Sequence, residues 1–253
     1  MTPAEIASTN TILLVTVDSG VHGVALEGTD DHDEMGICIE PPDHVIGLQP
    51  FEQYVFRTQP EGARSGPGDT DRIVYSLRKW ARLALNGNPT VLLLLFSPEI
   101  HITTTLGEEL RSAHSLFASK RAGKSFLGYL SAQKQRLLGE RGQMRVHRPE
   151  LVDAHGYDTK YAMHMLRLGI QGVEYMQSGA ITLPIPEPER EWLRQVRRGE
   201  VELNDVLTRV GELELELNDL IHSGPLPAKP DYAGANQLLV DAYQRHWQTG
   251  EPV

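Results

Sequence analysis

The chain has 253 residues, of which 40% are hydrophobic and 23% charged, and its formal net charge is −10 at pH 7. These values are ordinary for a soluble globular protein with one large or two modest domains. The single cysteine, Cys38, excludes an intramolecular disulfide and a metal site built from several thiolates. No apolar run is long enough to span a bilayer and no secretory signal is recognisable, so we expect a cytoplasmic protein without membrane contact.

The charge is unevenly distributed along the chain. Residues 1–56 contain no lysine or arginine, whereas residues 111–148 contain nine against one acidic residue, Glu140. An acidic part joined to a basic part suits an enzyme that holds metal with one and a polyanion with the other. The alternative interpretation, a solvated helix face or pairing with the acidic half, stays open.

The first predicted element is a buried strand at residues 12–17, which ends where Asp18, Ser19 and Gly20 introduce turn residues. A second strand at residues 36–39 follows and ends before two prolines. Backbone N–H groups of the turn could meet a phosphate. Between the strands, Asp31 and Asp33 are two residues apart on an extended segment. Their side chains therefore point the same way and can hold a hard divalent cation.

Further along, Asp71 opens an apolar strand at residues 73–75. Residues 157–168 are predicted to be a helix on which Lys160, His164 and Arg167 share one face. A proline-rich connector at residues 181–188 precedes two helices at 189–199 and 200–222, a linker and a last helix at 236–247. The apolar stripe of the helix at 200–222 is predicted to pack within the chain. Phe117, Phe126 and Tyr129 are interleaved with the basic residues and are predicted to be core residues in preference to base-stacking platforms.

Several of these blocks resemble the polymerase-beta-type nucleotidyltransferases, and more narrowly the nucleotidyltransferases associated with RNA ligases and RNA repair. The likeness covers about residues 11–200 and is carried by residues 18–25, 29–37, 71–80, 86–89, 106–110, 126–129 and 157–168. Two positions depart from the family pattern. Asp18 stands where glycine is usual, and residues 92–95 are all leucine where a glutamate is usual.

The resemblance implies an α+β fold, with a catalytic domain at residues 1–106, made of a small mixed sheet and helices, and a helical domain at residues 107–253. It implies transfer of a nucleoside monophosphate from an NTP to an acceptor, with release of pyrophosphate. Two Mg²⁺ or Mn²⁺ ions would be held by Asp31, Asp33 and a third carboxylate. Asp71 is the preferred third ligand, because in this fold the strand that it opens would lie beside the strand of Asp31 and Asp33. Asp69, two residues earlier and of the same strand parity, is the alternative.

The remaining site predictions concern the nucleotide and the acceptor. Ser19 and Gly20 would meet the outer phosphates, with His22 close by. Lys160, His164 and Arg167 would face the nucleotide. The structural alternative is that His164 is hydrogen-bonded in the helical core and Arg167 forms an ion pair with an acidic neighbour. The acceptor is expected to be an RNA or tRNA end, bound by Lys120, Arg121 and Lys124. Two alternatives stay open: nucleotidylation of a protein or small molecule, and a catalytically weakened NTP-binding regulatory module. The oligomeric state is not predicted.

Overall fold

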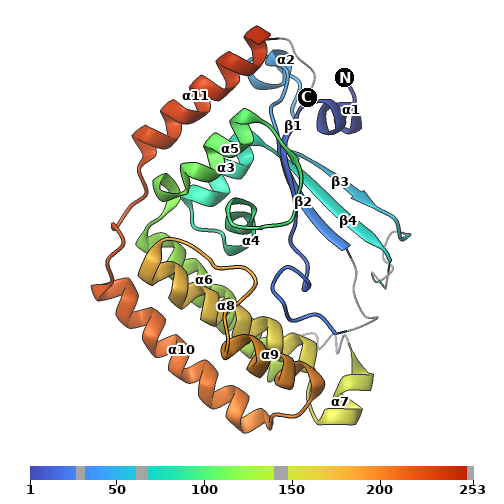
Figure 1. Cartoon of the computed structure of the whole chain (residues 1–253), viewed down its shortest axis with the longest axis vertical. Coiled ribbons are helices and arrows are strands. Elements are labelled where there is room, and N and C mark those ends of the chain that lie inside the picture. Colours follow the sequence, from blue (N-terminus) through green and yellow to red (C-terminus); the bar gives the residue numbers. More distant parts are fainter. Residues whose placement is uncertain (27–31, 61–65, 67, 140–147, 250–253) are drawn as a thin grey trace.

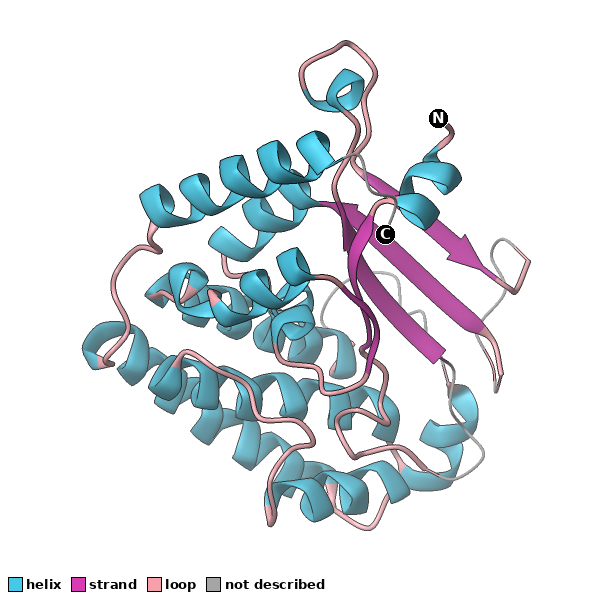
Figure 2. Ribbon diagram, turned by 45° about the horizontal axis from the view of Figure 1, so that its top comes forward, coloured by secondary structure: helices cyan, strands magenta, loops and turns pink. Residues whose placement is uncertain are grey.

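A computed structural model describes residues 1–26, 32–60, 66, 68–139 and 148–249 of the chain. Within these residues a five-stranded sheet lies to one side of a group of helices, so the predicted α+β class is confirmed (Figures 1 and 2). None of the described helices is long and apolar enough to cross a membrane.

The sheet is mixed, and its strands are ordered β3-β4-β2-β1-β5. Strand β1 pairs antiparallel with β2 and β5, β3 pairs antiparallel with β4, and β2 pairs parallel with β4. The predicted neighbourhood of the Asp33 and Asp71 strands is therefore confirmed. The bounds are β1 (Thr11–Thr16), β2 (His32–Cys38), β3 (Gln53–Arg57), β4 (Thr70–Ser76) and β5 (Ile100–Thr103).

Strand β2 begins at His32, four residues before its predicted start at Gly36. The apolar run starts only at Met35, but the ladder with β4 already pairs His32 with Thr70 and Asp33 with Asp71. Backbone pairing thus holds polar residues in an extended conformation that their side chains do not signal. The consequence is that Asp33 lies within the sheet and not in the preceding loop.

Helices cover both faces of the sheet and build the second half of the chain. Their bounds are α1 (Pro3–Thr9), α2 (Pro42–Val45), α3 (Leu77–Leu85), α4 (Pro89–Leu92), α5 (Thr105–Ser112), α6 (Lys120–Leu137), α7 (Pro149–His155), α8 (Thr159–Ser178), α9 (Glu189–Arg198), α10 (Leu203–Ser223) and α11 (Tyr232–Thr249), with short 3₁₀ turns at Leu93–Leu95 and His114–Phe117. Helices α3 and α5 share a core with the sheet, whereas Ile6 of α1 packs on the opposite face with Cys38 and Val74.

Helices α6, α8, α9 and α10 share a second core. The stripe of α10 is buried in it, as predicted, through Val206, Val210, Leu213 and Leu217. Close packing depends on a glycine of α8, because a Cβ atom at Gly169 would lie 2.8 Å from a side-chain carbon of Leu213. Helix α8 is thereby held rigidly beside α10.

The last helix, α11, returns to the sheet half of the chain (Figure 1). The hydroxyl of Tyr243 donates to Glu40 at 2.6 Å, and the indole N–H of Trp247 donates to the Glu40 carbonyl at 2.9 Å. Arg245 forms an ion pair with Glu109 of α5. The predicted domain boundary at residue 106 stays a prediction, with the qualification that α11 packs against elements that precede it.

Candidate active site

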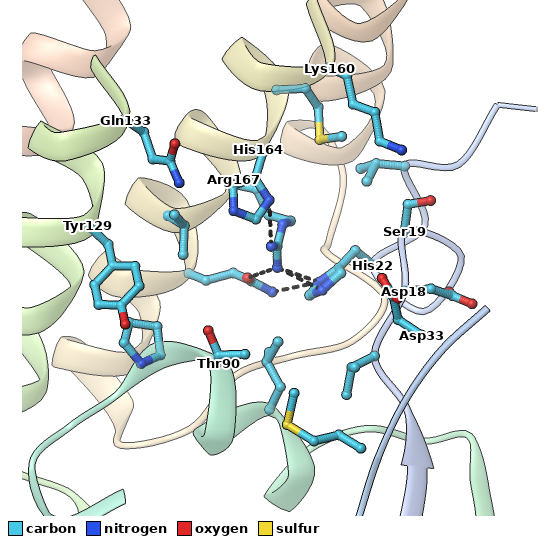
Figure 3. A pocket seen from close by; sticks show the side chains of 18 of the residues that line it. Asp18, Ser19, His22, Asp33, Thr90, Tyr129, Gln133, Lys160, His164 and Arg167 are labelled. Atoms are coloured by element: carbon cyan, nitrogen blue, oxygen red, sulfur yellow. Dashed lines mark hydrogen bonds between the residues drawn. The ribbon is translucent and has the colours of Figure 1, made fainter. Parts of the chain in front are cut away.

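A cleft of about 520 Å³ lies where the sheet meets the helices, and its volume is in the range of nucleotide-sized ligand sites (Figure 3). Its walls come from the loop after β1, the first residues of β2 and β4, the start of α4, and one face each of α6 and α8. The predicted residues Ser19, His22, Asp33, Asp71, Lys160, His164 and Arg167 all line it. The structure therefore brings together side chains that are up to 148 positions apart in the sequence, from Ser19 to Arg167.

The acidic wall is built by Asp33 and Asp71. They are register partners on parallel neighbouring strands, and both carboxylates line the cleft. The Asp71 carboxylate accepts a hydrogen bond from the side-chain amide of Gln59 at 2.9 Å and forms an ion pair with Arg57 at 3.2 Å. Arg57 comes from β3, directly opposite Asp71 in the ladder. Strand β3 and the residues that follow it thus hold the Asp71 side chain in place.

Two further carboxylates were predicted as ligands of the metal site, Asp31 and, as an alternative to Asp71, Asp69. Asp31 lies outside the described residues. Asp69 organises the turn before β4, because its carboxylate accepts hydrogen bonds from the Gly66 N–H at 2.9 Å and the Thr58 hydroxyl at 3.0 Å. Asp69 is not among the described residues that line the cleft, whereas Asp71 is. The geometry thus favours Asp71 as the carboxylate that faces a ligand.

The two placed carboxylates offer the hard oxygen donors that Mg²⁺ and Mn²⁺ prefer. Among the described residues, no group of three or more His, Cys, Asp or Glu side chains is arranged to hold a metal ion. A metal bound here would therefore need Asp31, water or substrate oxygens to complete its ligand set around Asp33 and Asp71.

The loop after β1 is organised by the carboxylate of Asp18. This side chain is only 8% exposed, and its Oδ1 accepts hydrogen bonds from the backbone N–H groups of Gly20 at 2.8 Å and Val21 at 3.2 Å. Such a local turn is a common role for aspartate. The Gly20 amide, which we expected to meet a phosphate, and its neighbour at Val21 are thus bound by a carboxylate of the chain itself. Ser19 lines the cleft, whereas Gly20 is exposed and is not among the described lining residues.

On the opposite wall, Arg167 of α8 is the centre of a buried polar network (Figure 3). It donates to His22 Nε2 at 2.7 Å, to Gln171 Oε1 at 3.0 Å and to His164 Nδ1 at 3.0 Å. His22 Nδ1 lies 3.0 Å from the Gln171 amide. Since a guanidinium can only donate, the two imidazole nitrogens that face it are acceptors.

This network concentrates positive charge on Arg167. Burial, reinforced by the neighbouring Arg167 charge, holds the pKa of His22 well below its usual value and lowers the pKa of His164 to about 3. Burial lowers the pKa of Arg167 to about 10, so the guanidinium stays charged at neutral pH while both histidines are neutral. All of its described partners are neutral side chains. A buried cation with only neutral partners is costly unless an anion joins it, which makes this wall of the cleft an anion-binding candidate.

The predicted acceptor-binding lysines and arginine lie elsewhere on α6. Lys120 donates to the His222 carbonyl at 2.9 Å, and Arg121 donates to the Tyr232 hydroxyl at 3.0 Å. Lys124 is exposed. None of the three is among the described residues that line the cleft. If they bind an acceptor, they do so on the surface outside the cleft.

Sequence analysis did not predict that Gln171 and Tyr129 line the cleft. Gln171 continues the spacing of Lys160, His164 and Arg167 along α8, and this spacing could have revealed it. The prediction that Tyr129 is a core residue is wrong, because its side chain is 41% exposed and lines the cleft. Phe126, one turn earlier, is buried as predicted, and Leu130, the next residue after Tyr129, is also buried, so only one face of α6 turns to the cleft. Phe117 is likewise buried.

Comparison with known proteins adds the family. No functionally curated protein matches the chain. A solved structure, described as a nucleotidyltransferase-like protein from Exiguobacterium sibiricum 255-15, aligns with 96% of this chain and 77% of its own, at 14% identity and a TM-score of 0.32. The sequence matches the family described as the RNA repair pathway DNA polymerase beta family over residues 3–241. The chain therefore belongs to the RNA repair pathway DNA polymerase beta family and is an enzyme of the nucleotidyltransferase class.

Proposed function

We propose that the cleft binds an NTP with a divalent metal and transfers its nucleoside monophosphate to an RNA end. The observation that carries this proposal is the pairing of two unlike walls in one cleft. The carboxylates of Asp33 and Asp71 form one wall. The buried guanidinium of Arg167, whose hydrogen-bond partners are uncharged side chains, lies on the other. A metal-bound triphosphate has both the cation and the anionic oxygens that these walls would take.

The residues would divide the reaction between them. Asp33 and Asp71, with Asp31, would hold Mg²⁺ or Mn²⁺, which supplies charge stabilisation for in-line displacement at phosphorus. Arg167 and Lys160 would bind the phosphate oxygens, and His22 would position Arg167. Ser19 would donate to the outer phosphates. An acceptor hydroxyl would then attack the α-phosphorus and lose its proton to solvent. A new P–O bond would form, the bond to the β-phosphate oxygen would break, and pyrophosphate would leave with its electron pair.

The RNA acceptor is supported by the family description and by the basic segment on α6. Lys120, Arg121 and Lys124 are the residues proposed to contact its phosphates. One observation favours the weakened NTP-binding module as a second candidate: the Asp18 carboxylate occupies backbone amides beside the cleft. A negative charge there would oppose the outer phosphates.

The test is incubation of the purified chain with each α-³²P-labelled NTP, Mg²⁺ or Mn²⁺ and total cellular RNA. The matched variants are Asp33→Asn combined with Asp71→Asn, and Asp69→Asn as the control outside the cleft. We expect label to enter RNA with the intact chain and with Asp69→Asn, and the rate to fall at least about 100-fold in the double variant, since active-site charge stabilisation commonly contributes that much.

Other outcomes redirect the proposal in defined ways. If the label enters protein or a small molecule, that molecule and not RNA is the acceptor. NTP binding that depends on the aspartates, but without pyrophosphate release for any acceptor, would support the binding module. RNA retention that is unchanged by neutralising Lys120, Arg121 and Lys124 together would remove these residues from the acceptor surface.

A further inference from the structure

At the end of the cleft away from Asp33, helix α6 presents Tyr129 and Gln133, one turn apart (Figure 3). The Tyr129 ring is 41% exposed although it lines the cavity. The side-chain oxygen of Gln133 is buried, and it has no hydrogen-bond partner in the described part of the chain. No other feature of the cleft combines an open aromatic face with an unsatisfied acceptor next to it, as far as its described residues show.

An orphaned acceptor at this place is informative. A buried polar atom without a partner costs about 1–3 kcal/mol, so such atoms are rare and are commonly satisfied by a ligand or water. The Gln133 amide carries a donor beside its acceptor, and it can therefore pair with an edge that offers both in the reverse order. The edge of a nucleobase is such a surface.

The Tyr129 ring is oriented by a contact outside the cavity. The Asn88 side-chain amide donates to the Tyr129 hydroxyl at 3.3 Å. The same Asn88 side chain caps the start of α4 by accepting from the N–H groups of Thr90 and Val91. The ring is thus tied to α4 by its hydroxyl end, while 41% of the residue is exposed. Stacking on such an exposed ring is the usual way for an aromatic side chain to hold a base.

The order of groups along the cleft matches the order of groups in a nucleotide. Tyr129 and Gln133 lie at one end, the Arg167 network in the middle, and Ser19 and Asp33 at the other end (Figure 3). We propose that Tyr129 and Gln133 form the subsite for the base of the incoming NTP, with stacking on Tyr129 and paired hydrogen bonds to the Gln133 amide. This inference rests on the proposed function, since it places the triphosphate between Arg167 and the carboxylate of Asp33.

The Gln133 amide alone does not select one base, because each of the four bases presents a donor beside an acceptor. The substitution Gln133→Glu changes this property. A carboxylate offers two acceptors, and guanine alone among the four presents two adjacent donors, N1–H and the 2-amino group. The variant is therefore expected to acquire a preference for GTP.

The test measures equilibrium affinities of non-hydrolysable MgNTP analogues by calorimetry. We expect Gln133→Glu to raise the ratio of GTP to ATP affinity at least about fivefold relative to the unmodified chain, in line with base discrimination by a paired side chain. Tyr129→Ala should weaken all four analogues by about 5- to 150-fold, the range for loss of base stacking. Tyr129→Phe keeps the ring and should stay within about threefold. Thermal unfolding of each variant checks that it is folded. If Tyr129→Ala does not fold, the isosteric Gln133→Glu variant still tests the subsite through its base preference.

Inorganic tripolyphosphate with Mg²⁺ separates this inference from the proposed function, because it has no base. Its affinity should fall in the Asp33→Asn and Asp71→Asn double variant and stay unchanged in the Tyr129 and Gln133 variants. Aspartate-dependent binding of tripolyphosphate with an unaltered NTP preference in Gln133→Glu would overturn the base subsite and leave the proposed function standing. Altered RNA affinity with unaltered NTP affinity would also overturn it. Binding that ignores the aspartates would overturn the proposed function itself.

Discussion

Arg167 of α8 donates a hydrogen bond to His22 in the loop after β1, with 2.7 Å between Nη1 and Nε2. The contact joins the helical half of the chain to the sheet half across 145 positions. The connector before α9 supports it, because the Ile185 N–H donates to the His22 carbonyl at 3.2 Å. His22 is only 2% exposed, so its ring is a fixed part of the wall and positions the guanidinium.

The first prediction concerns the charge of Arg167. Arg167→Met should weaken binding of Mg-tripolyphosphate and MgNTP by at least about tenfold, since a hydrogen bond to a charged group contributes about 1.5–3 kcal/mol. Arg209→Met is the matched control, because Arg209 is paired with Glu212 on α10 outside the cleft. Calorimetry measures both affinities. Equal affinities for the two variants would mean that Arg167 serves the core alone.

The second prediction concerns Asp18. Asp18→Asn keeps an oxygen that can accept from Gly20 and Val21 but removes a negative charge beside the cleft. We expect the affinity for MgNTP to rise several-fold, because like charges no longer oppose each other, with little change in melting temperature. If Asp18 were a ligand of the metal, the same substitution would instead lower Mn²⁺ affinity, which electron paramagnetic resonance of bound Mn²⁺ would reveal.

The third prediction is a pH dependence of stability from the two buried histidines. Their pKa values are lowered in the folded chain, to about 3 for His164, so between about pH 3 and 6.5 the unfolded chain binds more protons than the folded one. Stability is therefore complete above pH 6.5 and falls as the pH decreases, by about 1.4 kcal/mol per pH unit for each histidine.

Urea unfolding between pH 5 and 7.5 measures this dependence in a range where most carboxylates stay ionised. His164→Asn should reduce the slope of the free energy of unfolding against pH by about the contribution of one histidine. His155→Asn, on the exposed surface of α7, should leave this slope unchanged. A flat profile in the unmodified chain would show that neither imidazole is held neutral.

The fourth prediction concerns the docking of α11. Burial raises the pKa of the Glu40 carboxyl, and the Tyr243 hydroxyl donates to it at 2.6 Å while accepting from the Arg78 N–H. Tyr243→Phe removes that donor from a buried acceptor and should lower the free energy of unfolding by about 1–3 kcal/mol. Tyr232→Phe, at the more exposed start of α11, is the control. Chemical denaturation compares the two, and an equal loss would contradict a specific Glu40 contact.

The sequence predicted those features that depend on local periodicity. The apolar run of β1 and the stripe of α10 follow from strand and helix periodicity, whereas the placement of Asp71 beside Asp33 was implied by the family resemblance. The shared face of Lys160, His164 and Arg167 on α8 follows from the same spacing. Their roles in binding stay predictions until they are measured.

These local patterns do not predict which side chains meet in the folded chain. The same spacing describes a helix residue that faces the core and one that faces a cleft, which is why Tyr129 was assigned to the core. The ion pair of Arg57 with Asp71 depends on the pairing of β3 with β4, and the short β3 segment, with three apolar residues in a row, shows no alternation that would predict it. The contact of Tyr243 with Glu40 spans 203 positions and has no local signature.

The most direct measurement is calorimetric titration of a non-hydrolysable NTP analogue, with and without Mg²⁺, into the intact chain, the Asp33→Asn and Asp71→Asn double variant, and Asp69→Asn. We expect Mg²⁺ to strengthen binding at least about tenfold in the intact chain and in Asp69→Asn, and to have no effect in the double variant. Binding that is equally strong in all three proteins, or indifferent to Mg²⁺ in the intact chain, would contradict a metal–nucleotide site between Asp33, Asp71 and Arg167.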